Sequence, residues 1–358
     1  MTLAQAFAAA NHDVTVASGG TPVDGLETMG IRFVQLPPLK SDGTNFTTLL
    51  TASGDPADPD YLNDRQRILL DCLNTHPDLL ITELYPFGRR VLAGEFNNLL
   101  DRACQQDTPP IILCSIRDIL APPSKPAKAA RTDEIIARYF DGVLVHSDER
   151  ATPLEVSWPV SNQLRPKLQY TGFVAPSMPV AHPDQAGLNE ILVSAGGGAV
   201  GAPMFRAAMD AAALSPDLAW RILVGGREPE PLIAQLKSRA TENVHIEAAR
   251  PDFRQMLNHA IGSVSLAGYN TAMDVLQTGI PAVFIPFDDG GEVEQSLRAQ
   301  SLSELPAIKV LRSADLTPAR LQRAVRDIIQ SGRRAPHSVA MTGAQRTVEI
   351  AEQMVKTR

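Results

Sequence analysis

Short apolar segments alternate with segments of helical periodicity along almost the whole of this 358-residue chain. Such alternation is typical of parallel β-sheets, because a parallel strand pair needs a crossover and that crossover is usually an amphipathic helix. The predicted strands are 14–17, 32–35, 79–82, 111–115, 142–145, 168–171, 191–194, 221–224, 244–247, 262–266, 281–285 and 308–310. The sequence therefore predicts an α/β fold in which parallel sheets carry helices on both faces.

One stretch interrupts this alternation and divides the chain. Residues 175–189 hold Pro176, Pro179 and Pro183 and show no periodicity, as is usual for a linker. The length also favours two domains over one. We predict an N-terminal α/β domain over 1–174, a linker over 175–189, a C-terminal α/β domain over 190–335 and a last helical segment over 336–358 that packs back on the body. Within the first domain, residues 37–60 are predicted to form a long polar loop.

Charge and cysteine content exclude several classes of protein. Lys and Arg number 33 against 40 Asp and Glu, a net charge of −7, which argues against a nucleic-acid partner. The three cysteines fit no disulfide framework and favour a reducing compartment, so we expect a cytoplasmic protein. No apolar run reaches the roughly 18 residues that a transmembrane helix needs, which leaves peripheral membrane contact open.

The clearest local motif is a glycine-rich turn after the predicted strand 191–194. Gly196, Gly197 and Gly198 precede a predicted helix, and Gly201 completes the spacing G-x-G-x-x-G. Glycine lets the backbone approach a phosphate closely, and the N-terminus of the following helix favours an anion. The alternative is a tight strand–helix turn that binds nothing.

The following strand argues against a nicotinamide cofactor. A dinucleotide site needs an acidic side chain near the end of that strand to bind a ribose. Here the strand ends in Gly225, Gly226 and Arg227, and the first acid is Glu228. The interpretation of the glycine-rich turn as a nicotinamide dinucleotide site is therefore weakened.

A second anion-binding turn is predicted after the strand 262–266. Gly268 forms the turn, Asn270 or Thr271 is expected to cap the next helix, and Gly279 ends it. Asp274 lies about one turn into that helix, where its carboxylate could accept two hydrogen bonds from ribose hydroxyls. An aspartate that only compensates the helix dipole is an equally good interpretation.

A third polar loop follows the predicted strand 281–285 and enters a helix. Ligands of open parallel sheets bind outside the carboxyl ends of the strands. Glu294 and Gln295 lie there and could hydrogen-bond sugar hydroxyls. A solvated first helical turn is the simpler alternative.

The N-terminal domain offers polar residues at two strand ends. Glu83 could be a general base, and Arg89 or Arg90 could bind an anionic acceptor group. Arg117 and Asp118 follow another strand with the same two roles open. A structural Glu–Arg pair is the alternative at the first strand end.

Nothing in the sequence predicts a metal or a cofactor. The seven histidines show no metal-ligand spacing. Asp58-Pro59-Asp60 has the D-x-D spacing of metal-dependent transferases, but it lies in a proline-containing loop and not at a strand end.

Taken together, the three C-terminal motifs resemble the nucleotide-sugar domain of GT-B glycosyltransferases, and most closely that of glycosyltransferase family 28. The resemblance covers about residues 191–330, and the segment 80–90 is similar to one in a group of uncharacterised predicted glycosyltransferases. It implies two Rossmann-like domains, with the acceptor bound by the first and the donor by the second. It also implies inverting, metal-independent transfer from a UDP- or dTDP-linked sugar to a small-molecule, lipid or glycan acceptor.

The resemblance also implies roles for particular residues. Asp274 takes the position at which the family usually has the Glu that holds the donor ribose, and Glu294 and Gln295 take positions facing the donor sugar. The glycine turn and the helix start at Asn270 and Thr271 would face the diphosphate.

Members of this family begin with a strand and a glycine-rich turn that precede the first helix. Residues 3–10 already read as that helix, so the first strand of the N-terminal sheet is expected to be missing from this sequence. Either the true start lies upstream of Met1, which we favour, or the protein lacks this strand and uses Glu83 or Asp118 as its base.

Two other functions stay open at this point. A nucleotide-sugar epimerase shares the two-domain architecture, and a non-catalytic nucleotide-sugar-binding protein would retain the same motifs. Product analysis separates all three.

Overall fold

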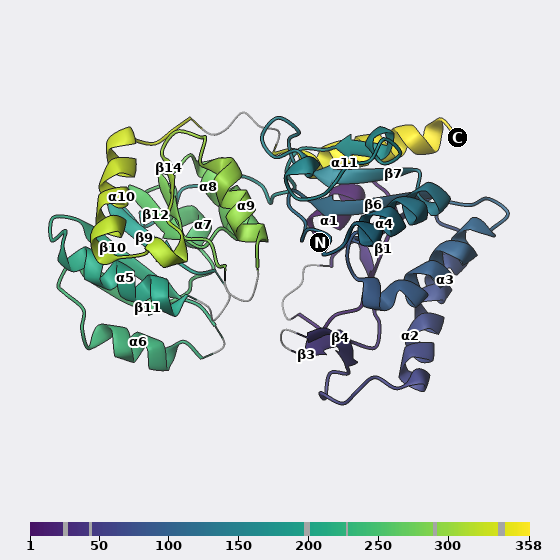
Figure 1. The fold of residues 1–358 in the computed structure, drawn as a ribbon, viewed down its shortest axis with the longest axis horizontal. Coiled ribbons are helices and arrows are strands. Elements are labelled where there is room, and N and C mark those ends of the chain that lie inside the picture. The colour runs from purple at the N-terminus through teal and green to yellow at the C-terminus, as the bar shows by residue number, and fades with distance from the viewer. Residues whose placement is uncertain (24–27, 43–44, 197–200, 227, 289–291, 336–340) are drawn as a thin grey trace. The chain divides into compact units, whose positions relative to one another are not determined.

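The computed structural model describes residues 1–23, 28–42, 45–196, 201–226, 228–288, 292–335 and 341–358. The chain forms two compact units (Figure 1). Unit 1 comprises Met1–Glu149, Pro153–Val174 and Thr342–Arg358, and unit 2 comprises Arg150–Thr152 and Ala175–Met341. No helix among the described residues is long and apolar enough to cross a membrane.

Unit 2 is built on one six-stranded parallel sheet with the strand order β11-β10-β9-β12-β13-β14. Its strands are β9 (Glu190–Ser194), β10 (Ala219–Val224), β11 (Val244–Ala248), β12 (Gly262–Ser265), β13 (Ala282–Phe284) and β14 (Ile308–Val310). Its helices are α5 (Ala202–Ala213), α6 (Glu230–Lys237), α7 (Phe253–Met256), α8 (Tyr269–Thr278), α9 (Glu294–Leu302) and α10 (Pro318–Ser331). This strand order is that of a doubly wound Rossmann-like domain.

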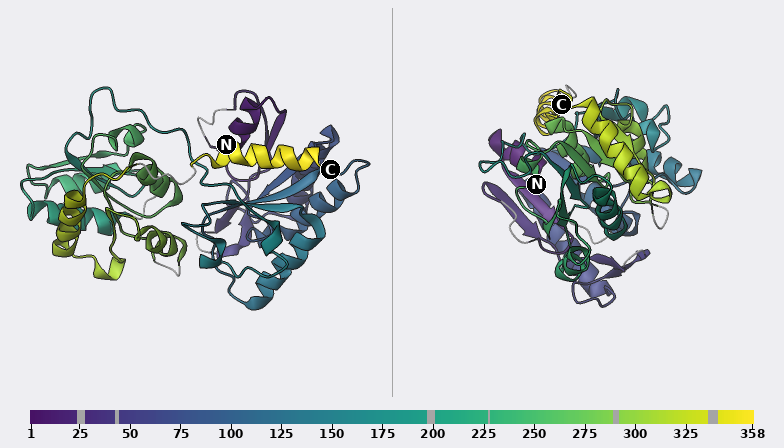
Figure 2. Two further views of the ribbon diagram at one scale, coloured as in Figure 1. Left: turned by 90° about the horizontal axis from the view of Figure 1, so that it is seen from above. Right: turned by 90° about the vertical axis from the view of Figure 1, so that its left-hand side faces the viewer.

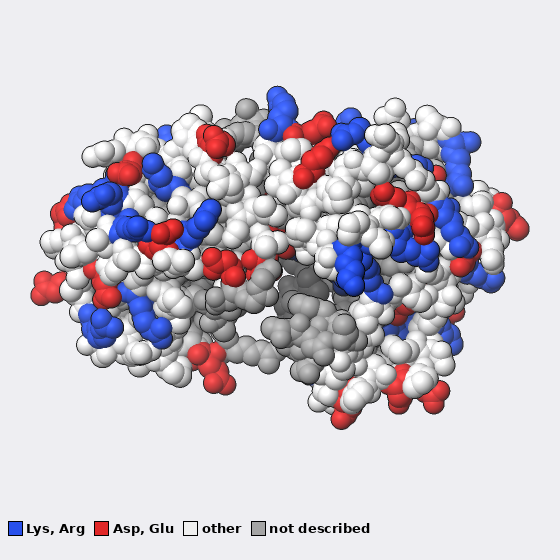
Figure 3. Space-filling model, in the orientation of Figure 1, with Lys and Arg blue, Asp and Glu red and all other residues white. Residues whose placement is uncertain are grey.

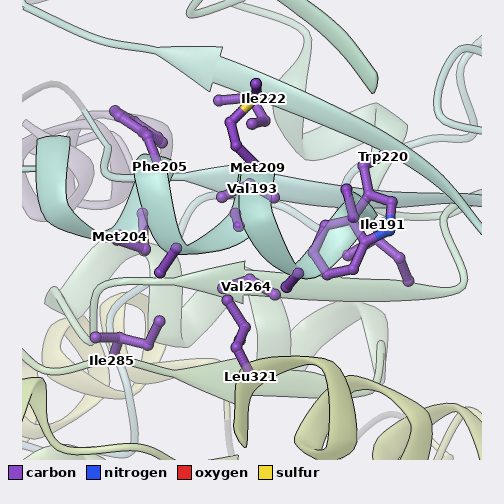
Figure 4. Packing of buried hydrophobic residues seen from close by; sticks show 14 of the residues in the cluster. Ile191, Val193, Met204, Phe205, Met209, Trp220, Ile222, Val264, Ile285 and Leu321 are labelled. Atoms are coloured by element: carbon purple, nitrogen blue, oxygen red, sulfur yellow. The ribbon is translucent and has the colours of Figure 1, made fainter. Parts of the chain in front are cut away.

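The core of unit 2 forms where α5 and α10 cover one face of this sheet. Ile191 and Val193 of β9 and Val264 of β12 pack in one cluster with Phe205 of α5 and Leu321 of α10, and all five are at most 2% exposed (Figure 4). Alternate residues of a strand point to one face, so the apolar runs of these strands supply that face with a continuous hydrophobic surface.

Unit 1 contains a four-stranded parallel sheet, a separate parallel pair and a short antiparallel hairpin. The larger sheet has the order β5 (Leu79–Glu83), β6 (Ile111–Arg117), β7 (Gly142–His146) and β8 (Leu168–Tyr170). The parallel pair is β1 (Val14–Ser18) with β2 (Ile31–Gln35), and the hairpin is β3 (Lys40–Asp42) with β4 (Asn45–Leu50). The helices are α1 (Thr2–Ala9), α2 (Pro59–Asp71), α3 (Ala93–Cys104), α4 (Pro126–Tyr139) and α11 (Gly343–Lys356).

Strand β6 shows how helices cover both faces of this sheet. Ile112 and Ile116 pack in the cluster formed with α2, α3 and α4. Ile111 and Leu113, whose side chains point to the opposite face of the sheet, pack in the cluster formed with α1 and α11. The strand is buried on both faces because its side chains alternate between two helical layers.

The last helix, α11, belongs to unit 1 and lies beside α1 (Figure 2). Its first residue, Gly343, donates a backbone hydrogen bond of 3.0 Å to the carbonyl of Phe173. A Cβ at position 343 would lie 2.4 Å from the carbonyl oxygen of Gly172, so only glycine allows this approach.

The α/β class with parallel sheets and helices on both faces is thus confirmed, and each predicted strand is present within about two residues. The prediction for 37–60 was wrong, because β3, β4 and the start of α2 lie there. Helix α4 begins at Pro126, since proline is favoured in the first helical turn. Residues 175–189 group with unit 2.

A buried arginine of α2 contacts three other segments of unit 1. Arg65 of α2 is 3% exposed and forms hydrogen bonds of 2.5 and 3.2 Å with the carboxylate of Glu95 on α3. The same guanidinium donates to the carbonyl oxygens of Gly19, after β1, and Pro37, after β2, at 3.0 and 2.6 Å. Arg65 therefore joins the parallel pair β1–β2 to the helices.

Candidate functional site

The strand order of unit 2 determines where a ligand can bind. From β9 the chain first proceeds through β10 to β11 on one side of β9, and it then returns to add β12, β13 and β14 on the other side. The loops after β9 and β12 therefore leave neighbouring strands in opposite directions, which is the topological switch point at which open α/β sheets bind ligands. Ser194 and Ser265 are paired across the two strands at this carboxyl end.

The two described glycines of the loop after β9 lie at its two ends. Gly196 has a φ of +71°, in the region that favours glycine, and its N–H donates 3.1 Å to the hydroxyl of Ser194. Gly201 is the N-cap of α5, and a Cβ there would lie 2.3 Å from Cβ of Ala195. The third glycine of the motif thus allows close packing of helix on strand.

Part of this predicted site lies outside the described residues. The positions concerned are Gly197 and Gly198, which follow β9, and Arg227, which follows β10. Gly225 and Gly226 are described and follow β10 directly, with a φ of +110° at Gly226.

Helix α8 begins earlier than the sequence predicted. Gly268, with extended backbone, is the N-cap, and Tyr269 is the first helical residue. The prediction that Asn270 or Thr271 caps the helix was wrong, because both already lie in its first turn. The Gly268 N-cap makes no side-chain cap hydrogen bond, and a helix N-terminus at the switch point of a parallel sheet suits an anion.

Asp274 lies in the second turn of α8, further from the helix start than predicted. It is 7% exposed, and its Oδ1 accepts a 2.6 Å hydrogen bond from Nε of Arg254. Burial raises the pKa of Asp274, and the Arg254 guanidinium opposes that rise. Arg254 also donates to Gln277 at 2.8 Å and to the carbonyl of Ser177 at 3.0 Å.

A hydrogen bond from Arg298 joins α9 to the loop after β12. Arg298 is 1% exposed, donates 3.0 Å to the carbonyl of Ala267 and 2.8 Å to Glu294 Oε1, and lies 5.6 Å from the ring of Tyr269. Gln295 accepts a 3.2 Å hydrogen bond from the N–H of Phe287, after β13. Glu294 and Gln295 therefore lie where polar contacts already join the loops after β12 and β13.

Unit 1 places Glu83 at the carboxyl end of β5. Its side chain is 66% exposed and lies 3.3 Å from Nη2 of Arg89, whose Nε donates to the Glu83 carbonyl at 3.2 Å. Leu84 and Arg89 both have positive φ, 68° and 52°, so this turn is held in a conformation that these residues rarely adopt. The structural Glu–Arg pair considered from the sequence is present.

The other predicted site residues of unit 1 differ in how exposed their side chains are. Asp118 is 1% exposed, whereas Arg117 at the end of β6 is exposed. Arg90 donates 3.0 Å to the carbonyl of Phe87 and lines a cavity beside α4. Glu83 is therefore the accessible carboxylate of the two that the sequence put forward as bases.

A buried histidine network lies at the carboxyl ends of three strands of unit 1. His146, at the end of β7, is 5% exposed; its Nε2 lies 2.8 Å from Ser115 Oγ and its Nδ1 2.9 Å from Thr171 Oγ1. Thr171 donates its own hydrogen to the carbonyl of Gly172 at 2.7 Å, so it accepts from Nδ1–H and leaves Nε2 to accept from Ser115. Burial lowers the pKa of His146 to about 4.

Within the described part of the chain, no group of three or more His, Cys, Asp or Glu side chains could hold a metal ion. Asp58 of the D-x-D sequence is the N-cap of α2 and accepts from the N–H of Tyr61 at 2.8 Å. Its position in the chain is therefore explained by helix capping.

Three residues of these sites were not predicted from the sequence. Arg254, Arg298 and His146 belong to no sequence motif. Their hydrogen-bond partners lie 20 or more residues away in the chain, except Glu294, which precedes Arg298 by four residues, an ordinary spacing within a helix. No periodicity or spacing could have predicted them.

Comparison with known proteins gives a family match for the C-terminal half. Residues 192–354 match the model described as the glycosyltransferase family 28 C-terminal domain. Two bacterial enzymes named UDP-N-acetylglucosamine–N-acetylmuramyl-(pentapeptide) pyrophosphoryl-undecaprenol N-acetylglucosamine transferase are similar in sequence. That from Corynebacterium efficiens is 41% identical over 66 residues, 18% of each protein, and that from Haemophilus influenzae is 26% identical over 126 residues, 34% of this chain and 36% of the enzyme. The chain thus matches only about a third or less of these relatives.

Solved structures extend the likeness to the whole fold. MurG of Acinetobacter baumannii superposes with a TM-score of 0.63 at 15% identity, covering 99% of this chain and 94% of that one. A kitacinnamycin glycotransferase gives 0.63 at 17% with the same coverage, and a calicheamicin glycosyltransferase gives 0.58 at 18%, covering 99% and 90%. The two Rossmann-like units predicted from the resemblance are confirmed as a GT-B-type fold.

Proposed function

We propose that this chain, whose residues 192–354 form a glycosyltransferase family 28 C-terminal domain, transfers a sugar from a nucleotide diphosphate sugar to an acceptor. The observation that carries the proposal is the placement of Gly196 and Gly268 at the switch point of unit 2, after β9 and β12. Each precedes a helix without a side-chain cap, α5 or α8. Backbone N–H groups and helix dipoles at this place suit a diphosphate.

The donor is proposed to lie along the carboxyl ends of the unit 2 strands. The diphosphate would contact the turns at Gly196 and Gly268, and Asp274 would accept hydrogen bonds from the ribose. Glu294 and Gln295 would face the donor sugar. UDP or dTDP is the proposed carrier, in keeping with the two UDP-N-acetylglucosamine transferases that the chain resembles.

The reaction is proposed to be a single inverting displacement. The acceptor oxygen attacks the anomeric carbon, the bond from that carbon to the phosphate oxygen breaks, and the nucleoside diphosphate leaves with the electron pair. Glu83 is the proposed base, because its carboxylate is exposed whereas that of Asp118 is buried.

The three free cysteines agree with a cytoplasmic location.

Product analysis tests this proposal. The full chain is incubated with UDP-N-acetylglucosamine, UDP-glucose or dTDP-glucose and a panel of lipid and glycan acceptors, and the products are followed by mass spectrometry. A glycosylated acceptor with release of the nucleoside diphosphate supports transfer. An isomeric nucleotide sugar without acceptor would show an epimerase, and binding without either product would show a non-catalytic protein.

Replacing Asp274 with alanine should weaken UDP binding by about 10- to 150-fold, corresponding to about 1.5–3 kcal/mol for hydrogen bonds to a charged group. Titration calorimetry measures the affinity. Asp217→Ala is the matched control, because it also removes one carboxylate paired with an arginine, on the surface of unit 2. Arg254→Ala breaks the same ion pair while keeping the Asp274 carboxylate, so it should retain binding. Unchanged UDP affinity in folded Asp274→Ala would exclude the ribose assignment.

Transfer should continue at the same rate in the presence of EDTA. The proposed stabilisation of the leaving diphosphate comes from backbone N–H groups and helix N-termini, and these need no metal. The rate with EDTA is compared with the rate after adding magnesium or manganese. Activity lost with EDTA and restored by either metal would contradict this prediction.

A further inference from the structure

We propose that Arg298 of α9 is a positioning residue for the donor sugar and acts through the carboxylate of Glu294; this inference rests on the proposed transferase function. The Arg298 side chain is 1% exposed, so it does not itself reach a bound sugar. Glu294, one turn earlier on the same helix, is 33% exposed and meets the surface. The buried arginine therefore influences the sugar only through the side chain that is proposed to face it.

The guanidinium of Arg298 is held on two sides. Its Nη1 donates 3.0 Å to the carbonyl of Ala267, in the loop after β12, and its Nη2 donates 2.8 Å to Oε1 of Glu294. Its Cζ lies 5.6 Å from the ring centroid of Tyr269, the first residue of α8. A guanidinium is planar and its N–H groups point in fixed directions, so these contacts determine where the Glu294 carboxylate lies relative to the start of α8.

The pairing with Arg298 leaves Glu294 able to bind a sugar hydroxyl. The hydrogen bond uses Oε1, and an ionised carboxylate can accept about four hydrogen bonds through its two oxygens. A glutamate side chain that is not held samples several rotamers, and ordering it on binding would cost conformational entropy. Arg298 fixes the carboxylate before the donor arrives, which preorganises it for binding.

The surroundings of Glu294 are acidic, and Arg298 opposes this charge from inside. Oε1 of Glu292 accepts a 2.6 Å hydrogen bond from the backbone N–H of Glu294, so a second carboxylate lies close by. Figure 3 shows acidic side chains gathered on this face of unit 2 near α9. Like charges repel, and a buried guanidinium attracts a carboxylate more strongly than an exposed one because solvent screens it less. Arg298 therefore keeps Glu294 turned toward the loop after β12.

The cost of burying this arginine argues for a role beyond stability. Burial removes the hydration of the guanidinium, and a methionine of similar length would fill the same space without that cost. The neighbouring Gln295 is fixed separately, by a 3.2 Å hydrogen bond from the N–H of Phe287 after β13. The two side chains proposed to face the sugar are thus each held by a different loop, as expected of a preorganised subsite.

Titration calorimetry on the full chain separates the sugar from the nucleotide. Each free nucleotide is compared with its sugar conjugate, UDP with UDP-N-acetylglucosamine or UDP-glucose and dTDP with dTDP-glucose, and the ratio of the two Kd values is the readout. In Arg298→Met the conjugate should lose about tenfold more affinity than the free nucleotide, as for a lost hydrogen bond to a charged group. Arg298→Lys keeps the charge without the fork of donors and should show a smaller change in the same direction.

Two further variants test how Arg298 acts. Glu294→Ala should change the ratio as Arg298→Met does, and the double variant should be no worse than Glu294→Ala, because both substitutions remove the same interaction. Arg334→Met is the matched control: its guanidinium also donates to backbone carbonyls of unit 2, those of Val275 and Ile280, at the other end of α8. This control should leave the ratio unchanged.

Three results would overturn the inference: an unchanged ratio in the folded Arg298 variants, the same change in Arg334→Met, or additive effects of Arg298→Met and Glu294→Ala. Wild-type protein that binds a nucleotide but none of the sugar conjugates would also overturn it, since no sugar would then lie at α9. Wild-type protein that binds neither UDP nor dTDP would instead contradict the transferase proposal, and this inference with it.

Discussion

Replacing Arg65 with methionine should lower the free energy of unfolding of unit 1 by about 3–5 kcal/mol, since it removes one partner of a buried ion pair. Glu95, whose side chain is 10% exposed, would keep its charge without a counter-ion. The carbonyl oxygens of Gly19 and Pro37 would each lose a donor. The methionine side chain has a similar length, so the loss reflects charge and hydrogen bonding more than an empty cavity.

Urea denaturation followed by tryptophan fluorescence measures this effect. The chain has two tryptophans, Trp158 in unit 1 and Trp220 in unit 2, so a Trp220→Phe background reports on unit 1 alone. Arg67→Met on the same helix is the matched control: its pairs with Asp64 and Asp71 are exposed, and its loss should cost under about 1 kcal/mol. Equal destabilisation by the two substitutions would show that burial of Arg65 is unimportant.

Acidification should destabilise unit 1 through His146 by about 3 kcal/mol. Burial lowers the pKa of this histidine from 6.5 to about 4, so between these values the unfolded chain binds a proton that the folded chain does not. The free energy of unfolding therefore falls as the pH drops through this window. Protonation would also force Ser115 to turn its hydroxyl hydrogen away from Nε2.

His146→Gln removes the titrating group and should reduce this loss of stability between pH 7 and pH 4. The measurement is the difference in unfolding free energy between the two pH values for each protein, again with Trp158 as the reporter. His76→Asn is the control, because His76 is exposed and asparagine tolerates its positive φ of 49°. An identical pH dependence in His146→Gln and the wild type would contradict the prediction.

These two predictions involve residues that carry no signal in the sequence. Arg65 and Glu95 lie 30 positions apart on different helices, and Ser115 and His146 lie 31 positions apart on neighbouring strands. An arginine in an amphipathic helix normally reads as a solvated side chain. Arg65 is buried because α2 packs against α3 beside the ends of β1 and β2. Its guanidinium therefore contacts all of these segments at once.

The candidate donor site was predictable to a different degree at each turn. The position of the glycine-rich segment between β9 and α5 was predictable, because a strand, G-x-G-x-x-G and a helix follow one another directly in the chain. The start of α8 was missed by two or three residues, since Gly268 reaches the capping backbone conformation without a polar side chain. The contact of Asp274 with Arg254, 20 residues away, depends on the packing of α7 near α8.

The sequence by itself determined the α/β class, the strand segments and the positions of the glycine-containing turns, because periodicity and turn chemistry are properties of consecutive residues. Only the tertiary structure decided which side chains meet. It placed β9 beside β12, so that the turns after Ser194 and Ser265, 71 residues apart, share one switch point. It also buried Arg65, His146 and Arg298 and left Glu83 exposed. Strand order and helix packing join residues that are distant in the chain, and local sequence patterns do not contain that information.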